Sequence, residues 1–314
     1  MKGATILRWL LPFVGTGALL AYLLRRIQLR DALDAVTLES ALVIVPVTLG
    51  YGCLSVWIDG VSLSRLTRYA GRVADVATCA RIKAASYALG LVNYAVGAAA
   101  LAVLFRRRVG LGLAAAAGLV ATVAITDLAM LILVTGTSTA LFTTEAAALR
   151  TSVAVTTIAV VFGGLAVLRA PVPLGPLERL RHLDLFRTVR SAPVSLLAEL
   201  ALLRIAFVLT FIAMGAGCLL AFGVHIPPGP LVAGMASIAL IGALPIAVAG
   251  LGTVQLATIG LFSAYADDAT LFAASLAMQV AMILVRAAMA LVFAREFTRE
   301  AAQATRSEAE APGT

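Results

Sequence analysis

Asp127, Arg204 and Arg286 each lie deep within a long apolar stretch of the sequence. A charged side chain inside a bilayer costs about 2.5–3.5 kcal/mol on insertion scales, so these residues are candidates for function. Asp127 predicts either a coupling-ion site or an ion pair with an arginine. Arg204 and Arg286 could each hold a lipid phosphate through charge-assisted, bidentate hydrogen bonds. The alternatives for each arginine are an ion pair with Asp127 or snorkelling to the interface.

A break in the apolar run 231–262 provides a second group of candidates. Pro245 lacks the amide hydrogen that an unbroken helix needs, and Gly250 and Gly252 give the backbone freedom just after it. The run is also longer than the hydrocarbon core, which a helix of about 20 residues crosses. We therefore expect two half-helices that meet at a turn lining a cavity. These half-helices are predicted over 231–244 and 253–262.

Neutral polar residues lie at this turn and near the middle of the run 84–105. Gln255 follows the turn, where either a helix–helix hydrogen bond or a ligand contact explains a buried glutamine. Asn93 and Tyr94 lie where we expect a second turn, opposite the first. The pair could contact a headgroup, although a turn-forming asparagine explains Asn93 equally well.

The composition indicates that transmembrane helices position these residues. Of the 314 residues, 61% are hydrophobic and only 13% are charged, whereas soluble proteins carry about 25% charge. The formal net charge is +8, but the arginines lie between apolar runs, so the charge indicates topology and contact with anionic lipid. These features exclude a soluble enzyme, a secreted disulfide scaffold and a nucleic-acid partner.

The sequence predicts an all-α polytopic membrane protein, a single domain over 1–314, with about six full transmembrane helices. The first is expected to be an uncleaved span, followed by a short helix at headgroup level over 25–38. A second amphipathic helix is expected over 171–190. The predicted spans are the apolar runs 9–24, 39–58, 111–134, 149–168, 192–222 and 270–294.

Two runs do not fit as simple spans. The run 84–105 lies between the basic segments 59–83 and 106–108, so both of its ends should be cytoplasmic. It is too short to cross twice and is predicted to be a re-entrant hairpin. The run 231–262 should start and end outside, as a second re-entrant hairpin of opposite orientation, an inverted-repeat-like layout. The same rule places both termini, including the polar tail 295–314, on the cytoplasmic side of the cell membrane.

The stretch Leu244–Gln255, LPIAVAGLGTVQ, resembles the proline-glycine signature of the lysylphosphatidylglycerol synthase transmembrane (flippase-like) family. The approach Gly223–Leu231 and the segment Arg106–Leu111, which leads into the run containing Asp127, are similar to that family as well. The likeness extends over about 10–295, and Gln255 stands where members usually carry glutamate. It implies a membrane domain that moves amphiphilic lipids between leaflets.

We therefore expect a flippase-like protein that binds or translocates an anionic lipid or a lipid-linked glycan. Because the chain ends about 20 residues after its last predicted span, we expect no aminoacyl-transfer domain and no synthase activity. The alternatives are a lipid-modifying transferase, or a scaffold that recruits a cytoplasmic partner enzyme through 59–83 or 169–190. Assembly into a homo-oligomer stays open. With two histidines, three cysteines and no nucleotide-binding loop, neither a metal, another cofactor nor ATP hydrolysis is expected.

Overall fold

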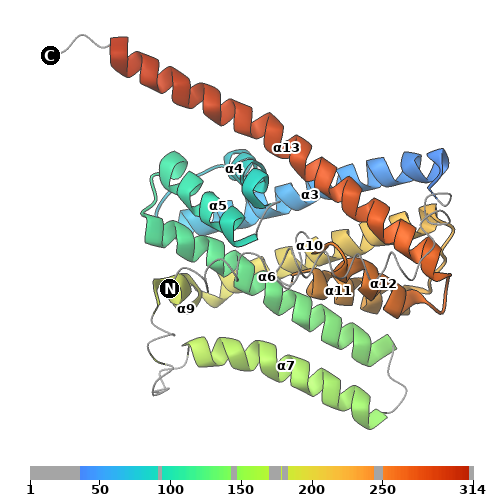
Figure 1. The fold of residues 1–314 in the computed structure, drawn as a ribbon. Coiled ribbons are helices and arrows are strands. Elements are labelled where there is room, and N and C mark those ends of the chain that lie inside the picture. The colour runs from blue at the N-terminus through green and yellow to red at the C-terminus, as the bar shows by residue number, and fades with distance from the viewer. Residues whose placement is uncertain are drawn as a thin grey trace, which may run out of the picture.

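The computed structural model describes residues 36–90, 94–142, 147–169, 178, 183–243 and 250–310. Within these residues the chain forms ten helices and no strand, so the predicted all-α class is confirmed (Figure 1). The helices are α3 (Leu38–Tyr69), α4 (Val76–Gly90), α5 (Tyr94–Val109), α6 (Leu113–Phe142), α7 (Ala147–Arg169), α9 (Asp184–Ser191), α10 (Val194–Ala221), α11 (Pro228–Ala243), α12 (Thr253–Phe262) and α13 (Asp268–Glu310).

Five of these helices are long and apolar enough to cross a bilayer, as expected of a multi-pass membrane protein. They coincide with five of the six predicted spans. The first predicted span, 9–24, and most of the headgroup-level helix predicted over 25–38 lie outside the described residues. The five spans are α3, α6, α7, α10 and the segment Asp268–Phe293 of α13.

Helix α3 continues well beyond the predicted run 39–58. Leu66 is fully buried, whereas Arg65 and Arg68 on either side of it are exposed, so one face of the helix stays in the core. The basic segment 59–83 is therefore not a single connection between membrane segments. Its first part belongs to α3 and its last part to α4.

Helices α4 and α5 form a hairpin in the region where the sequence predicts one. Gly97 lies so close to α4 that an added methyl group would be 2.6 Å from Cα of Gly90. The hairpin is longer than the predicted 84–105, because Cys79 and Ile82 of α4 are completely buried in the core that α4 shares with α3. The turn between the two helices lies outside the described residues.

Helices α11 and α12 form the second hairpin, which confirms the predicted break between two half-helices. A methyl group added at Gly234 of α11 would overlap the ring of Phe262, near the end of α12. At the other end of α11, one added at Gly242 would lie 3.4 Å from Val254, near the start of α12. The two helices are therefore antiparallel, with small residues that let them approach closely.

Helix α13 packs against both hairpins. Ala80 of α4 lies in a cluster with Phe293, and Tyr87, farther along α4, contacts Arg286. Earlier in α13, Gln279 lies beside Gly250, in the turn before α12. The turn ends of both hairpins therefore lie toward the same part of α13, as can be followed in Figure 1.

Helix α7 and the C-terminal part of α13 lie at the periphery (Figure 1). Helix α7 packs on α6 at the outer edge of the molecule (Figure 1), and Arg169 at its end donates to the carbonyl of Ala192 at 2.8 Å. Of the amphipathic helix predicted over 171–190, the structure describes mainly its last part, α9. Helix α13 extends as far as Glu310, so most of the polar tail predicted over 295–314 is helical.

Candidate functional site

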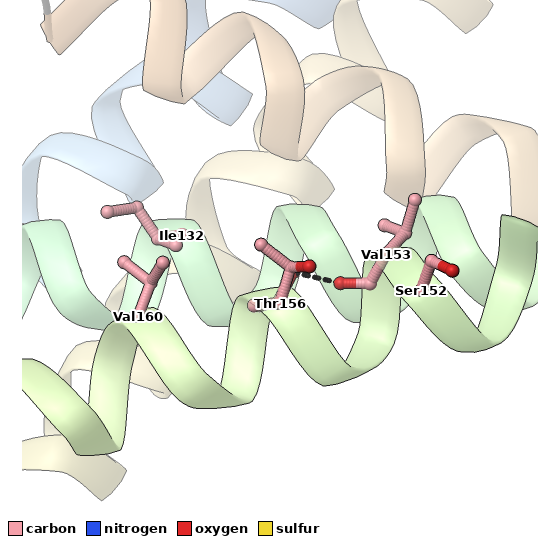
Figure 2. A pocket seen from close by; sticks show the side chains of 6 residues that line it. Ile132, Ser152, Val153, Thr156 and Val160 are labelled. Atoms are coloured by element: carbon pink, nitrogen blue, oxygen red, sulfur yellow. Dashed lines mark hydrogen bonds between the residues drawn. The ribbon is translucent and has the colours of Figure 1, made fainter.

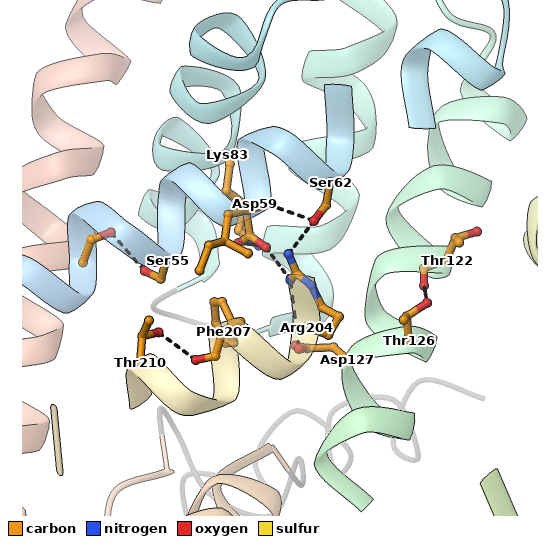
Figure 3. A network of polar contacts seen from close by, with 12 residues as sticks. Ser55, Asp59, Ser62, Lys83, Thr122, Thr126, Asp127, Arg204, Phe207 and Thr210 are labelled. Carbon is orange, nitrogen blue, oxygen red and sulfur yellow. Dashed lines mark hydrogen bonds and ion pairs between the residues drawn. The ribbon is translucent and has the colours of Figure 1, made fainter. Parts of the chain in front are cut away.

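A buried ion pair joins α3 to α10. Arg204 Nη1 donates to Asp59 Oδ1 at 2.6 Å, and both residues are at most 2% exposed (Figure 3). Arg204 Nη2 donates to the hydroxyl of Ser62 at 2.7 Å. Asp59 and Ser62 are three residues apart on α3 and so share one face of the helix, which presents both acceptors to one guanidinium. The ring of Phe207, 5.1 Å from Arg204 Cζ, covers the cation.

Helix α4 adds a second cation to the same carboxylate. Lys83 Nζ lies 3.1 Å from Asp59 Oδ2, and its side chain is 20% exposed. This contact requires a close approach of α3 and α4, which Gly60 permits. A methyl group at Gly60 would lie 2.8 Å from the carbonyl oxygen of Val76 and 2.9 Å from Cβ of Ala80. Asp59 therefore attracts both cations.

Asp127 of α6 approaches this pair without joining it. Its Oδ1 lies 4.0 Å from Arg204 Nη1 and has no hydrogen-bond donor. The Asp127 side chain is 26% exposed, whereas that of Asp59 is 3% exposed. Within the guanidinium of Arg204, Nε also lacks a hydrogen-bond partner. Arg204 thus has one fixed carboxylate and one loosely held carboxylate.

Arg286 of α13 is connected to these residues through tyrosines. Its Cζ lies 5.5 Å from the centre of the Tyr87 ring, and Lys83 Nζ lies 5.7 Å from the same ring. The phenol of Tyr51 is another neighbour of this guanidinium. Among the described residues, no carboxylate lies within 4.0 Å of Arg286.

We refer to Asp59, Lys83, Asp127, Arg204 and Arg286 as the charged cluster. With every member ionised it contains three cations and two carboxylates, a formal excess of one positive charge. Apolar helices surround it, so this excess is costly unless an anion neutralises it. The cluster is therefore suited to binding a phosphate or another anionic group.

The structure brings together three of the residues predicted from the sequence. Asp127 and Arg204 are neighbours, but the close partner of Arg204 is Asp59 and not Asp127. Arg286 does not pair with Asp127 and contacts tyrosines instead.

Sequence reasoning missed Asp59 and Lys83, because each lies at the margin of an apolar run. The signal that could have identified Asp59 is the buried face of α3, which continues from Asp59 through Leu66.

The turn of the second hairpin forms a separate polar group. Gly250 and Gly252 have φ of +74° and +89°, a conformation that glycine adopts without strain. The amide of Gly252 donates to Gln255 Oε1 at 2.6 Å, which fixes the start of α12. Gln255 is fully buried and its Nε2 has no hydrogen-bond partner. None of these residues is in the charged cluster.

Three of the predicted site residues cannot be placed in either group. Pro245 and Asn93 lie outside the described residues, and Tyr94 is described only as the first residue of α5. The contact that the sequence predicts for Asn93 and Tyr94 with a headgroup stays a prediction.

A groove of about 350 Å³ between α6 and α7 is a different feature (Figure 2). The hydroxyl of Thr157 within it donates to the carbonyl of Val153, in its own helix, at 2.8 Å. With no charged side chain in its lining, the groove offers an anion nothing comparable to the charged cluster. Its lining residues are Ile132, Ser152, Val153, Thr156, Thr157 and Val160.

In the part of the chain that the structure describes, no group of three or more His, Cys, Asp or Glu side chains could hold a metal ion. Neither a protein-family model nor a curated protein matches this chain significantly.

Proposed function

We propose that this membrane protein binds the headgroup of an anionic amphiphilic lipid at the charged cluster and moves it between leaflets. The observation that carries the proposal is the excess of positive charge in the charged cluster among apolar helices. Arg286 offers a guanidinium whose contacts are with Tyr87 and Tyr51. A lipid phosphate would supply the missing counter-ion through charge-assisted hydrogen bonds.

The two hairpins provide the route in this proposal. We propose that α4–α5 enters the membrane from the cytoplasmic side and α11–α12 from the outside, with both termini in the cytoplasm. The support is the charge distribution of the sequence and the position of both turn ends against α13. Interrupted helices that meet inside a bilayer are typical of secondary transporters.

A lipid is favoured over a soluble anion by the surroundings of the charged cluster. The helices that carry Asp59, Asp127, Arg204 and Arg286 all contain segments long and apolar enough to span the bilayer. An amphiphile could place its headgroup at the charged cluster while its acyl chains stay in the bilayer. The resemblance of Leu244–Gln255 to the flippase-like family favours the same class of activity.

The test is a leaflet-exchange assay in proteoliposomes containing fluorescent phosphatidylglycerol. Wild-type protein should bring the label in the inner leaflet within reach of an external quencher faster than empty vesicles do. Arg286→Gln should slow this exchange about tenfold or more, because hydrogen bonds to charged groups contribute about 1.5–3 kcal/mol. Arg107→Gln, at an exposed arginine in the last turn of α5, is the matched control and should keep the wild-type rate. Exchange no faster than in empty vesicles would overturn the proposal.

A further inference from the structure

We propose that Asp127 is a proton-binding site, and that its proton travels together with the anionic headgroup. The inference rests on the proposed function, because it names a co-substrate of the same charged cluster. It begins with a carboxylate oxygen, Asp127 Oδ1, that is buried and receives no hydrogen bond. An ionised carboxylate in that condition lacks the donors that normally compensate for its loss of water.

Neighbouring groups do not supply the missing hydrogen bond. The hydroxyl of Thr126 donates to the carbonyl of Thr122 at 2.8 Å, and that of Thr122 donates to Gly118, so both are engaged within α6. Arg204 Nη1 lies 4.0 Å away and is held by Asp59 at 2.6 Å. The carboxylate of Asp127 is thus attracted by a cation but is not hydrogen-bonded to it.

The charged groups around Asp127 come from three helices. Arg204 of α10 and Lys83 of α4 favour its ionised form, and Asp59 of α3 opposes it. Helix α11, which also packs on α6, contains no ionisable residue. The Asp127 side chain is 26% exposed, so the protein leaves part of its surface uncovered.

Protonation of Asp127 changes the charge that an anion experiences. The proton comes from water and binds a carboxylate oxygen, and the formal excess of the charged cluster rises from one positive charge to two. Arg204, including its unpartnered Nε, then loses a competing carboxylate. Proton binding therefore favours binding of the headgroup, and by linkage the headgroup favours binding of the proton. Binding of both together predicts symport.

The first test measures proton binding without transport. Infrared difference spectra of the full chain in phosphatidylcholine nanodiscs should show a carboxyl C=O band that appears on acidification and is lost in Asp127→Asn. Adding phosphatidylglycerol should move the midpoint of that titration to higher pH. Asp127→Glu, which keeps a carboxyl group, should restore the band. Identical titrations of the wild type and Asp127→Asn would overturn the inference, as would a midpoint that phosphatidylglycerol does not move.

The second test imposes a pH gradient on proteoliposomes containing fluorescent phosphatidylglycerol. With tight one-to-one coupling, the label should accumulate in the leaflet facing the alkaline side, about tenfold for a difference of about one pH unit. Asp127→Asn should abolish this asymmetry, and Thr126→Val, one position away, should retain it. If the label crosses faster than in empty vesicles but its distribution in the wild type ignores the gradient, the inference is overturned.

The two proposals fail in different ways. If Asp127 titrates with a lipid-dependent midpoint but no labelled lipid crosses faster than in empty vesicles, the proposed translocation is wrong and the proton site stands. If lipid crosses at equal rates with and without a gradient, and Asp127→Asn titrates like the wild type, the proton site is wrong and translocation stands. Glycerol phosphate, added at high concentration to the phosphatidylcholine nanodiscs, tests whether a free phosphate ester has the same effect as the lipid headgroup. A matching shift of the midpoint with glycerol phosphate alone would contradict coupling to a lipid.

Discussion

Arg204 donates to Asp59 at 2.6 Å across 145 residues of sequence, and this pair joins α10 to α3 inside the molecule. Lys83 shares the same carboxylate at 3.1 Å, so the single acid holds two cations from two further helices. One carboxylate therefore links α3, α4 and α10.

Replacing Asp59 by asparagine should strongly destabilise the protein. The substitution leaves the buried Arg204 with only the Asp127 carboxylate, 4.0 Å away and not hydrogen-bonded to it, and breaking a buried pair costs about 3–5 kcal/mol. The free energy of unfolding in detergent micelles measures this loss. Glu199→Gln is the control, because its pair with Arg65, at 2.7 Å, has both side chains more than 40% exposed and should contribute about 0–1 kcal/mol. Equal losses in the two variants would contradict the assignment of Asp59 as the central acid.

Gly60→Ala should separate α4 from α3. The new methyl group would meet the Val76 carbonyl at 2.8 Å and Ala80 at 2.9 Å, so the helices must move or strain, at a cost of about 1–3 kcal/mol. Gly50→Ala on the same helix meets nothing within 4 Å and should be neutral or slightly stabilising. Thermal unfolding of the two variants provides the comparison. A Gly60→Ala protein as stable as Gly50→Ala would show that this close approach is not required.

Gly252→Ala should weaken the start of α12. At φ of +89° a residue with a side chain is strained by about 1–2 kcal/mol. The strained residue is the one whose amide donates to Gln255, so this hydrogen bond should weaken. Gly260→Ala, in the same short helix with nothing within 4 Å, is the matched control and should not destabilise. Thermal unfolding in detergent should occur at a lower temperature in the first variant only. Equal unfolding temperatures of the two variants would contradict the role given to Gly252.

Asp267, before the first turn of α13, should make stability depend on acid pH. Hydrogen bonds from the backbone N–H and the hydroxyl of Thr270, at 2.9 and 2.7 Å, lower the pKa of its carboxyl below the ordinary value of 3.8. A lowered pKa in the folded state means that this stabilisation is complete above 3.8 and disappears as pH falls through the lowered pKa.

Asp267→Asn keeps an acceptor for the Thr270 amide but cannot titrate. The difference in unfolding midpoint between the wild type and this variant should therefore shrink or reverse as pH falls below about 4. Thermal unfolding in detergent over this pH range measures it. A difference that stays constant with pH would contradict the contribution of the Asp267 carboxylate.

The sequence predicts the elements of this structure better than their contacts. Hydropathy identifies the five described spans, because each has to be apolar over the thickness of a bilayer. The break between α11 and α12 follows from the proline and glycine chemistry of the sequence. Asp127, Arg204 and Arg286 can be recognised as unusual from their depth within apolar runs alone.

The pairing of these residues could not be predicted, because it depends on which helices pack together. Asp59 and Lys83 border apolar runs, where charged residues normally set topology and face water. Only the packing of α3 against α10 and α4 brings Asp59 to Arg204 and Lys83 to Asp59. The charge excess belongs to the assembled bundle and not to any one helix.

The central claim is that the charged cluster selects and moves anionic headgroups. Its most direct test is the rate of leaflet exchange for fluorescent phosphatidylglycerol and fluorescent phosphatidylcholine, measured in otherwise identical proteoliposomes. Phosphatidylglycerol should exchange about tenfold faster than phosphatidylcholine, and Arg286→Gln should remove that preference, since a lost charge-assisted hydrogen bond is worth about 1.5–3 kcal/mol. Equal rates for the two lipids in the wild-type protein, or rates no higher than in empty vesicles, would contradict it.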